Sequence, residues 1–105
     1  MTEPRESEAG FQGWVMQLAE VCGWSTLHIG KCPKRNYTPT QGTMSKGWPD
    51  LVLIRDGTLI CAELKTDKKY PTPQQREVHA ALEACGIAVY VWRPKDRPDI
   101  EEILR

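Results

Sequence analysis

Three charged side chains near the middle of the chain have types and spacing suited to binding a metal ion. Asp50, Glu63 and Lys65 all lie in the segment GWPDLVLIRDGTLICAELK, residues 47–65. Glu63 and Lys65 are two residues apart, so in a β-strand their side chains project from the same face. Two carboxylates with an amine beside them form a seat for a hard divalent cation.

The sequence between these residues predicts a hairpin that brings them together. Two apolar runs rich in β-formers, residues 50–54 and 58–64, flank the turn Arg55-Asp56-Gly57. Asp-Gly between two such runs is a strong hairpin signal, because glycine readily adopts the positive φ that tight turns need. In an antiparallel hairpin the start of one strand lies beside the end of the other, so Asp50 should reach the edge that carries Glu63 and Lys65.

These residues resemble the signature of a known nuclease superfamily. Pro49-Asp50, a spacer and Glu63-Leu64-Lys65 resemble the PD-(D/E)XK pattern, and GWPDL together with ELK and a downstream TPQQ is similar to its VRR-NUC branch. The resemblance covers residues 8–92, most of the chain. It implies a restriction-endonuclease-like αβββαβ core, a mixed sheet flanked by helices, and a Mg²⁺-dependent deoxyribonuclease activity.

The resemblance also implies roles for individual residues. Asp50 and Glu63 would bind Mg²⁺, with Mn²⁺ as an alternative, and the carbonyl oxygen of Leu64 would add a third ligand. Lys65 would orient or help deprotonate a water molecule and stabilise the pentavalent phosphate.

Two further residues are implied as members of the site, and each also has a simpler explanation. Glu8, at the start of the first helix, would complete the metal site, but an acid at that position is equally favoured by the helix dipole. Gln75 would point towards the site with a catalytic role, but a capping box with Thr72 alone accounts for a glutamine there. For Gln75 we expect both roles.

Periodicity and turn chemistry independently predict the order α-β-β-β-α-β-α, an α/β fold. The near-continuous apolar run IAVYVW predicts a buried strand, and the strand–helix–strand path from residue 58 to residue 92 predicts a parallel pair joined by a right-handed crossover. Outside the hairpin, the predicted elements are helix 8–22, strand 24–29, helix 73–85, strand 87–92, a turn over 93–98 and a final helix 99–104.

The second predicted helix has a clear start and an apolar stripe. Thr72 serves as N-cap, Pro73 occupies the first helical position, and Gln75 follows the cap by three. The predicted buried stripe consists of Val78, Ala81, Leu82 and Cys85. Cys61 and Cys85 each lie within an apolar segment and are expected to be small core residues.

Charge is balanced, with 14 basic and 14 acidic residues, which counts mildly against a nucleic-acid-binding protein. The basic residues are nevertheless clustered, and we expect the clusters to contact nucleic acid at Lys31, Lys34, Arg35, Lys46, Lys68 and Lys69. Several of these residues, with Tyr37, lie in a predicted loop over residues 30–46, which is long for a compact domain. A disordered connector is the alternative for that loop.

Length and composition indicate one small globular domain. Its 105 residues, 40% of them hydrophobic, fit a flexible segment 1–7 followed by a single domain over 8–105, which the resemblance implies is a VRR-NUC-like nuclease domain. The N-terminus is polar and acidic and no apolar run could span a bilayer, so we expect a cytoplasmic protein with no membrane partner. The resemblance to the VRR-NUC branch implies a protein of viral or bacterial type. The four cysteines lack zinc-site spacing and are expected to be reduced, and a zinc site from Cys22, Cys32 and His28 is disfavoured.

The predicted activity is structure-directed cleavage of branched or junction DNA in replication or repair, leaving 5′-phosphate ends. Because cutting a duplex symmetrically needs two active sites, we expect a homodimer. A flap or single-strand nickase, a catalytically idle nucleic-acid-binding module and a protein–protein adaptor remain alternatives. Roles for His28, Trp48 and Tyr70 are left open.

Overall fold

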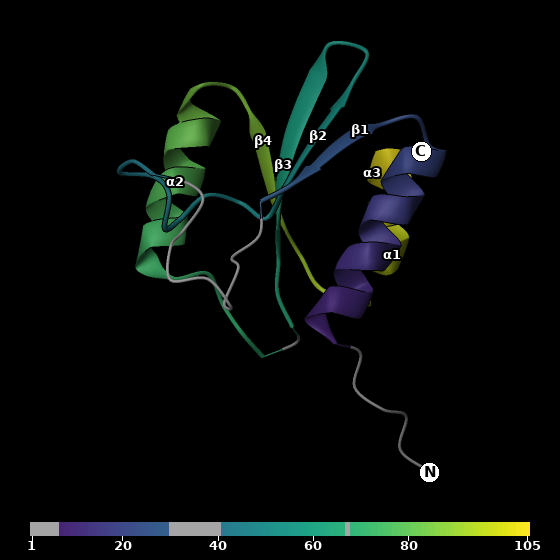
Figure 1. Ribbon diagram of the computed structural model, residues 1–105, viewed down its shortest axis with the longest axis horizontal. Helices are drawn as coiled ribbons and strands as arrows, with labels where there is room; N and C mark the ends of the chain where they lie inside the picture. The colour runs from purple at the N-terminus through teal and green to yellow at the C-terminus, as the bar shows by residue number, and fades with distance from the viewer. Residues whose placement is uncertain (1–6, 30–40, 67) are drawn as a thin grey trace.

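The computed structural model describes residues 7–29, 41–66 and 68–105, and these form one β-sheet with helices on both faces (Figure 1). The element order confirms the predicted α/β fold and is compatible with an αβββαβ core. The elements are α1 Glu8–Val21, β1 Ser25–His28, β2 Leu51–Arg55, β3 Thr58–Leu64, α2 Pro73–Ala84, β4 Ala88–Trp92, a short 3₁₀ helix η1 Pro94–Asp96, and α3 Arg97–Leu104.

The sheet is mixed, as predicted, with strand order β1-β2-β3-β4. β2 pairs antiparallel with both β1 and β3, whereas β3 and β4 are parallel. The parallel pair requires a crossover, and α2 supplies it. Because β3 lies between β2 and β4, it is a central strand, and the residues at its C-terminal end are buried.

The hairpin between β2 and β3 has a two-residue loop, because Arg55 pairs with Thr58. Both loop residues have positive φ, 50° at Asp56 and 79° at Gly57. Two consecutive left-handed residues are typical of a type I′ turn, whose twist matches that of the flanking strands. Arg55 thus belongs to the strand and not to the turn, one residue beyond the predicted boundary.

Alternation along β3 divides the core between the two faces of the sheet. Ile60, Ala62 and Leu64 pack in the larger cluster with α1 and α3, whereas Cys61 packs with Val78 and Leu82 of α2. Figure 1 shows this layering, with α2 on one side of the strands and α1 and α3 together on the other. Glu63 follows Cys61 by two residues, so it faces α2.

α2 is rotated relative to the predicted stripe. Its buried residues are Val78, His79 and Leu82, while Ala81 and Cys85 are exposed. The prediction for Ala81 and Cys85 was wrong because apolarity alone was used to choose the buried positions. An imidazole can be buried here because Glu63 on β3 offers it a polar partner.

The C-terminal part of the chain also differs from prediction. β4 lies at the edge of the sheet and only Trp92 is buried, so the expected buried strand was wrong. Residues 93–98 form η1 and the first turn of α3 in place of a turn. The Asp96 carboxylate accepts from the Arg93 N–H at 2.8 Å, and Pro94 and Pro98 occupy first-turn positions where no N–H is needed.

Two other predictions concern the segments around the described ranges. Ser7 is the N-cap of α1, accepting from the Gly10 N–H at 3.0 Å, and so belongs to the helix and not to a flexible segment. Residues 1–6 and 30–40, which include most of the predicted long loop, lie outside the described residues. None of the described helices has the length and apolar character needed to cross a membrane.

Candidate metal-binding site

Asp50 lies at the base of the hairpin, where the two strands hold it from both sides. The Leu64 N–H donates to Oδ2 of Asp50 at 2.8 Å, and the Ile29 N–H donates to the Asp50 carbonyl oxygen at 2.9 Å. Leu51 pairs with Ala62, and the same register sets Asp50 beside Glu63. The structure thus brings together the two carboxylates that the hairpin prediction placed at one edge.

Glu63 is a buried acid, with only 2% of its surface exposed. Burial, a hydrogen bond with the Asp50 carboxylate and the negative charge of Asp50 raise the pKa of Glu63 to about 9. The positive charge of Lys65 acts in the opposite direction, and Glu8 adds a further raising effect. Glu63 is therefore protonated at neutral pH in the metal-free protein.

His79 is the site residue that sequence reasoning missed. It is 7% exposed, and its Nε2 lies 3.4 Å from Oε1 of Glu63. Burial and the positive charge of Lys65 lower the pKa of His79, while Glu83 and Asp50 raise it less. The Glu63–His79 contact is thus between two uncharged groups at neutral pH. The one available signal was the four-residue spacing from Gln75, which sets both residues on one face of a helix.

The charges of Lys65 and Glu8 act on Glu63. Lys65 is half-buried just beyond β3, its N–H donates to the Trp92 carbonyl at 3.0 Å, and its charge acts on both Glu63 and His79. Glu8 is exposed in the first turn of α1, which in Figure 1 begins near the end of the sheet where β3 terminates. Its effect on the pKa of Glu63 agrees with that position.

Leu64 and Gln75 have backbone and capping contacts. The N–H of Leu64 holds Asp50, while the predicted role of its carbonyl oxygen stays a prediction. The capping box is confirmed: Gln75 Oε1 accepts from the Thr72 N–H at 2.8 Å, and Thr72 Oγ1 accepts from the Gln75 N–H at 3.1 Å. A catalytic role of Gln75 would therefore have to come from its Nε2.

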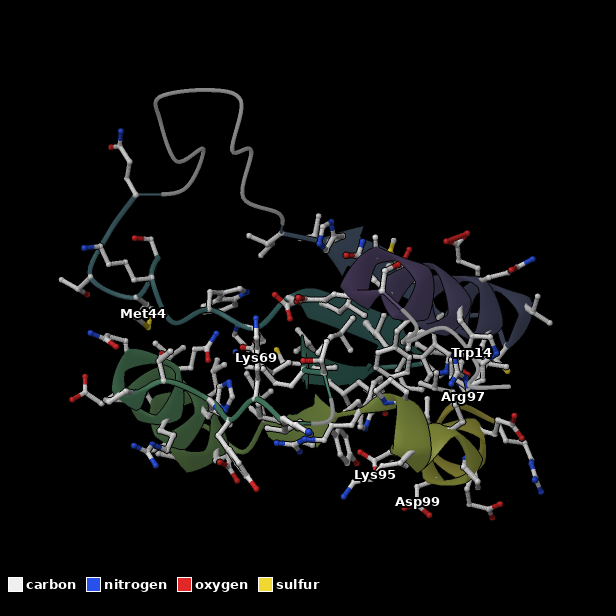
Figure 2. All side chains as sticks on the ribbon, turned by 90° about the horizontal axis from the view of Figure 1, so that it is seen from below. Trp14, Met44, Lys69, Lys95, Arg97 and Asp99 are labelled. Carbon is white, nitrogen blue, oxygen red and sulfur yellow. The ribbon has the colours of Figure 1, made fainter. Side chains whose placement is uncertain are left out.

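The predicted nucleic-acid contacts are described only in part. Lys46, Lys68 and Lys69 are exposed, and Figure 2 shows Lys69 at one end of the sheet, between α2 and the pair of α1 and α3. Arg93 anchors the loop that carries Lys69, since its Nη2 donates to the Lys69 carbonyl at 2.9 Å and its guanidinium lies over Tyr70 at 5.2 Å. The other predicted contacts are Lys31, Lys34 and Arg35, which lie outside the described residues, as does Tyr37.

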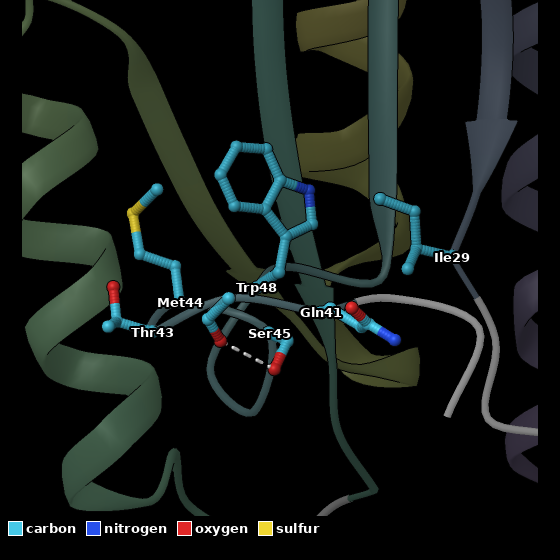
Figure 3. A pocket seen from close by; sticks show the side chains of 7 residues that line it. Ile29, Gln41, Thr43, Met44, Ser45 and Trp48 are labelled. Atoms are coloured by element: carbon cyan, nitrogen blue, oxygen red, sulfur yellow. Dashed lines mark hydrogen bonds between the residues drawn. The ribbon is translucent and has the colours of Figure 1, made fainter. Parts of the chain in front are cut away.

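A pocket of about 430 Å³ lies next to the segment that holds Asp50. Trp48 and Ile29 line it together with residues 41–45, as Figure 3 shows. Trp48 also packs on the smaller core cluster, and its buried Nε1 finds no acceptor among the described residues. His28 is exposed and pairs with Leu51, which belongs to the α1 face, so the structure does not bring His28 to the acid pair.

The carboxylate oxygens of Asp50 and Glu63 are ligands of the type that Mg²⁺ prefers. A buried carboxyl group that keeps its proton beside a second carboxylate is one whose proton a cation can replace. In the described ranges, no group of three or more His, Cys, Asp and Glu side chains could hold a metal ion. A structural zinc site needs four protein ligands, whereas Mg²⁺ usually keeps several waters and takes only one or two carboxylates. Asp50 and Glu63 are therefore enough for Mg²⁺.

Comparison of the chain with protein-family models and with curated protein sequences found no match. A functional assignment therefore depends on the buried Glu63 and its half-buried neighbour Asp50, on Lys65, and on the exposed lysines Lys46, Lys68 and Lys69.

Proposed function

We propose that this protein is a metal-dependent endonuclease that hydrolyses DNA phosphodiester bonds, as its resemblance to the VRR-NUC branch implies. One observation carries the proposal: Glu63 is buried beside Asp50, within the field of Lys65. A buried carboxyl group beside a second, half-buried carboxylate is costly, and perturbed acids of this kind are concentrated at functional sites. A purely structural pair would be better served by an amide or an apolar side chain.

Each residue of the site would have its own role in hydrolysis. Asp50 and Glu63 would hold Mg²⁺ or Mn²⁺, with the Leu64 carbonyl as a further oxygen ligand. When bound, the cation neutralises charge on the phosphate and lowers the pKa of water. The Lys65 ammonium group orients the attacking water and stabilises charge on the pentavalent phosphate. A bond would form from the water oxygen to phosphorus as the bond to O3′ breaks, and the proton that the water releases would pass through solvent to O3′, which leaves a 5′-phosphate and a 3′-hydroxyl.

DNA would be held through its backbone by the exposed lysines Lys46, Lys68 and Lys69. Contacts of this kind carry no base specificity, so cleavage is directed by DNA structure, at branches or junctions. A homodimer would supply the two active sites that symmetric cutting requires. Sedimentation equilibrium at micromolar concentration tests this oligomeric state.

A supercoiled-plasmid assay with Mg²⁺ or Mn²⁺ tests the activity. We expect the wild type to nick and then linearise the plasmid, and Lys65→Ala to cut about 10²–10⁴-fold more slowly. Lys95→Ala is the matched control, since Lys95 is an exposed lysine beside α3 and outside the site (Figure 2).

The alternative functions predict different results in this cleavage assay and in DNA-binding measurements. Nicked circles without linear product would indicate a flap or single-strand nickase. DNA binding without cleavage of nicked, flap or four-way substrates would indicate an idle binding module and contradict the proposal. Absence of DNA affinity even at low salt would indicate a protein–protein adaptor.

A further inference from the structure

His79 is a buried polar residue that the proposed reaction leaves without a role. It lies on α2, and its side chain turns towards Glu63 on β3. Its Nε2 lies 3.4 Å from Oε1 of Glu63, and both residues are almost fully buried. A side chain that served only to fill space at this position would need no nitrogen atom.

The chemistry of the contact fixes which group donates. A neutral imidazole has one N–H donor and one acceptor nitrogen. A carboxylate group that binds a cation has no proton to give and can only accept hydrogen bonds. Oε1 of Glu63 is therefore the acceptor towards α2, and the Nε2–H tautomer of His79 is the one that can donate to it.

We propose that His79 is a positioning residue for the metal site, an inference that rests on the proposed function. By donating from Nε2 to Oε1, it holds the Glu63 carboxyl group in one orientation and leaves the second oxygen for Asp50 and the cation. Partners of this kind orient ligands and tune their basicity in metal sites generally. The separation of 3.4 Å is longer than an ordinary N–H···O bond, and such contacts tighten when a site is completed.

Two substitutions of His79 separate positioning from packing. His79→Leu keeps an apolar bulk but removes the donor, whereas His79→Gln keeps an N–H donor close to the place of Nε2. We expect His79→Leu to weaken Mn²⁺ binding and slow plasmid cleavage by about 10–100-fold, and His79→Gln to restore most of both. Mn²⁺ affinity is read from the electron paramagnetic resonance signal of the free ion. The control is His28→Gln, at the exposed histidine of β1.

A spectroscopic measurement on the wild type needs no variant to fold. Long-range ¹H–¹⁵N correlation spectra of the protein with saturating Mg²⁺ report the tautomer of each histidine ring, and the sequence contains only two histidines. We expect the Nε2–H tautomer for His79. The Nδ1–H tautomer would overturn the inference, because Nε2 could then not donate to Glu63.

The outcomes separate the two proposals. If the wild type binds Mn²⁺ and cleaves DNA but folded His79→Leu does so equally well, the positioning role is wrong while the proposed function stands. If His79→Gln is as impaired as His79→Leu, the donor is not what matters and the inference again fails. If the wild type neither binds Mn²⁺ nor cleaves DNA, the proposed function itself is overturned and the inference with it.

Discussion

The proton on Glu63 links the stability of the metal-free protein to pH. The pKa of this carboxyl group is about 9 in the folded chain, against an ordinary value of 4.5. Between these values the folded state holds a proton that the unfolded state has released. Raising the pH therefore favours unfolding, and the free energy of unfolding falls by at most about 1.4 kcal/mol per pH unit from this group.

We predict that Glu63→Gln abolishes this loss of stability. An uncharged amide replaces the protonated acid, so the variant should gain stability over the wild type as the pH rises from about 7 to about 9, a range in which His79 stays neutral. Urea denaturation in the presence of a chelator measures the difference. Glu77→Gln, at an exposed position of α2, is the control and should follow the wild type. Parallel curves for Glu63→Gln and the wild type would contradict the raised pKa.

At the residue scale, the sequence could predict that Asp50 and Glu63 lie side by side, but not that His79 contacts Glu63. Asp50 and Glu63 meet because Asp-Gly fixes the hairpin register, and that signal is local. His79 meets Glu63 only because of the rotation of α2 about its own axis, which depends on packing between distant segments. Apolar periodicity favoured Ala81 and Cys85, and a histidine among them gave no indication that it had a polar partner on β3.

At the scale of elements, Gly47 sets how closely the segment before β2 approaches the start of α2. A Cβ atom on Gly47 would lie 2.7 Å from the Gln74 carbonyl carbon and 2.8 Å from Val78 Cγ2. One of these neighbours is backbone and cannot move without shifting the helix. The site needs this contact, since the segment leads into Asp50 and α2 carries Gln75 and His79.

We predict that Gly47→Ala destabilises the protein by about 1–3 kcal/mol and weakens Mn²⁺ binding, because α2 must move away. The matched control is Gly13→Ala in α1, where a Cβ atom would meet nothing within 4 Å. That change should stabilise by about 0.4–1 kcal/mol, since alanine is the better helix former. Thermal denaturation of both variants measures the contrast. Equal effects of the two substitutions would contradict the close approach.

Arg55 connects the ends of two helices from its place at the end of β2. Nη1 donates to the carbonyl oxygens of Cys22 at 2.9 Å and Leu104 at 3.0 Å, and Nη2 donates to that of Arg105 at 3.0 Å. The guanidinium carbon also lies 4.4 Å from the centroid of the Trp24 ring. Arg55 thus satisfies carbonyl groups that the ends of α1 and α3 leave without helical partners.

We predict that Arg55→Met lowers the free energy of unfolding by about 1–3 kcal/mol while leaving the acid pair intact. Methionine keeps an apolar stem over Trp24 but cannot donate to the carbonyl groups. Urea denaturation measures the loss, and Arg76→Met, on the exposed side of α2, is the control. A loss no larger than that of the control would show that the three hydrogen bonds contribute little.

Element identities were largely predictable, because caps and turn residues mark the ends of most helices and strands in this chain. In the C-terminal region the final helix was predicted over 99–104, but residues 93–98 were interpreted as a turn because of their dense set of prolines and charges, whereas η1 and the start of α3 lie there. Its helix depends on Ile100 and Leu104 packing into the core and on Arg55 holding the last carbonyl groups. These contacts link residues far apart in sequence, so no local pattern reports them.

At the scale of the whole molecule, a formal net charge of zero limits how DNA can be bound. Attraction must come from local clusters, and we predict that combining Lys46→Ala, Lys68→Ala and Lys69→Ala weakens binding and reduces the slope of log affinity against log salt by up to about 3. Fluorescence anisotropy over a salt series measures the slope. Lys95→Ala should leave it unchanged, and an unchanged slope in the triple variant would exclude these lysines as phosphate contacts.

The short loop between β2 and β3 also bears on the order of folding. Because only Asp56 and Gly57 separate the strands, each new cross-strand pair extends the previous one, whereas α2 must fold and cross the sheet before Leu82 is buried. We therefore expect Val52→Ala to slow folding and Leu82→Ala mainly to accelerate unfolding, with stopped-flow kinetics as the measurement and the reverse pattern as the contradiction. On that order, the two acids meet while water still reaches them, and the docking of α2 then buries Glu63 and brings the imidazole of His79 to it.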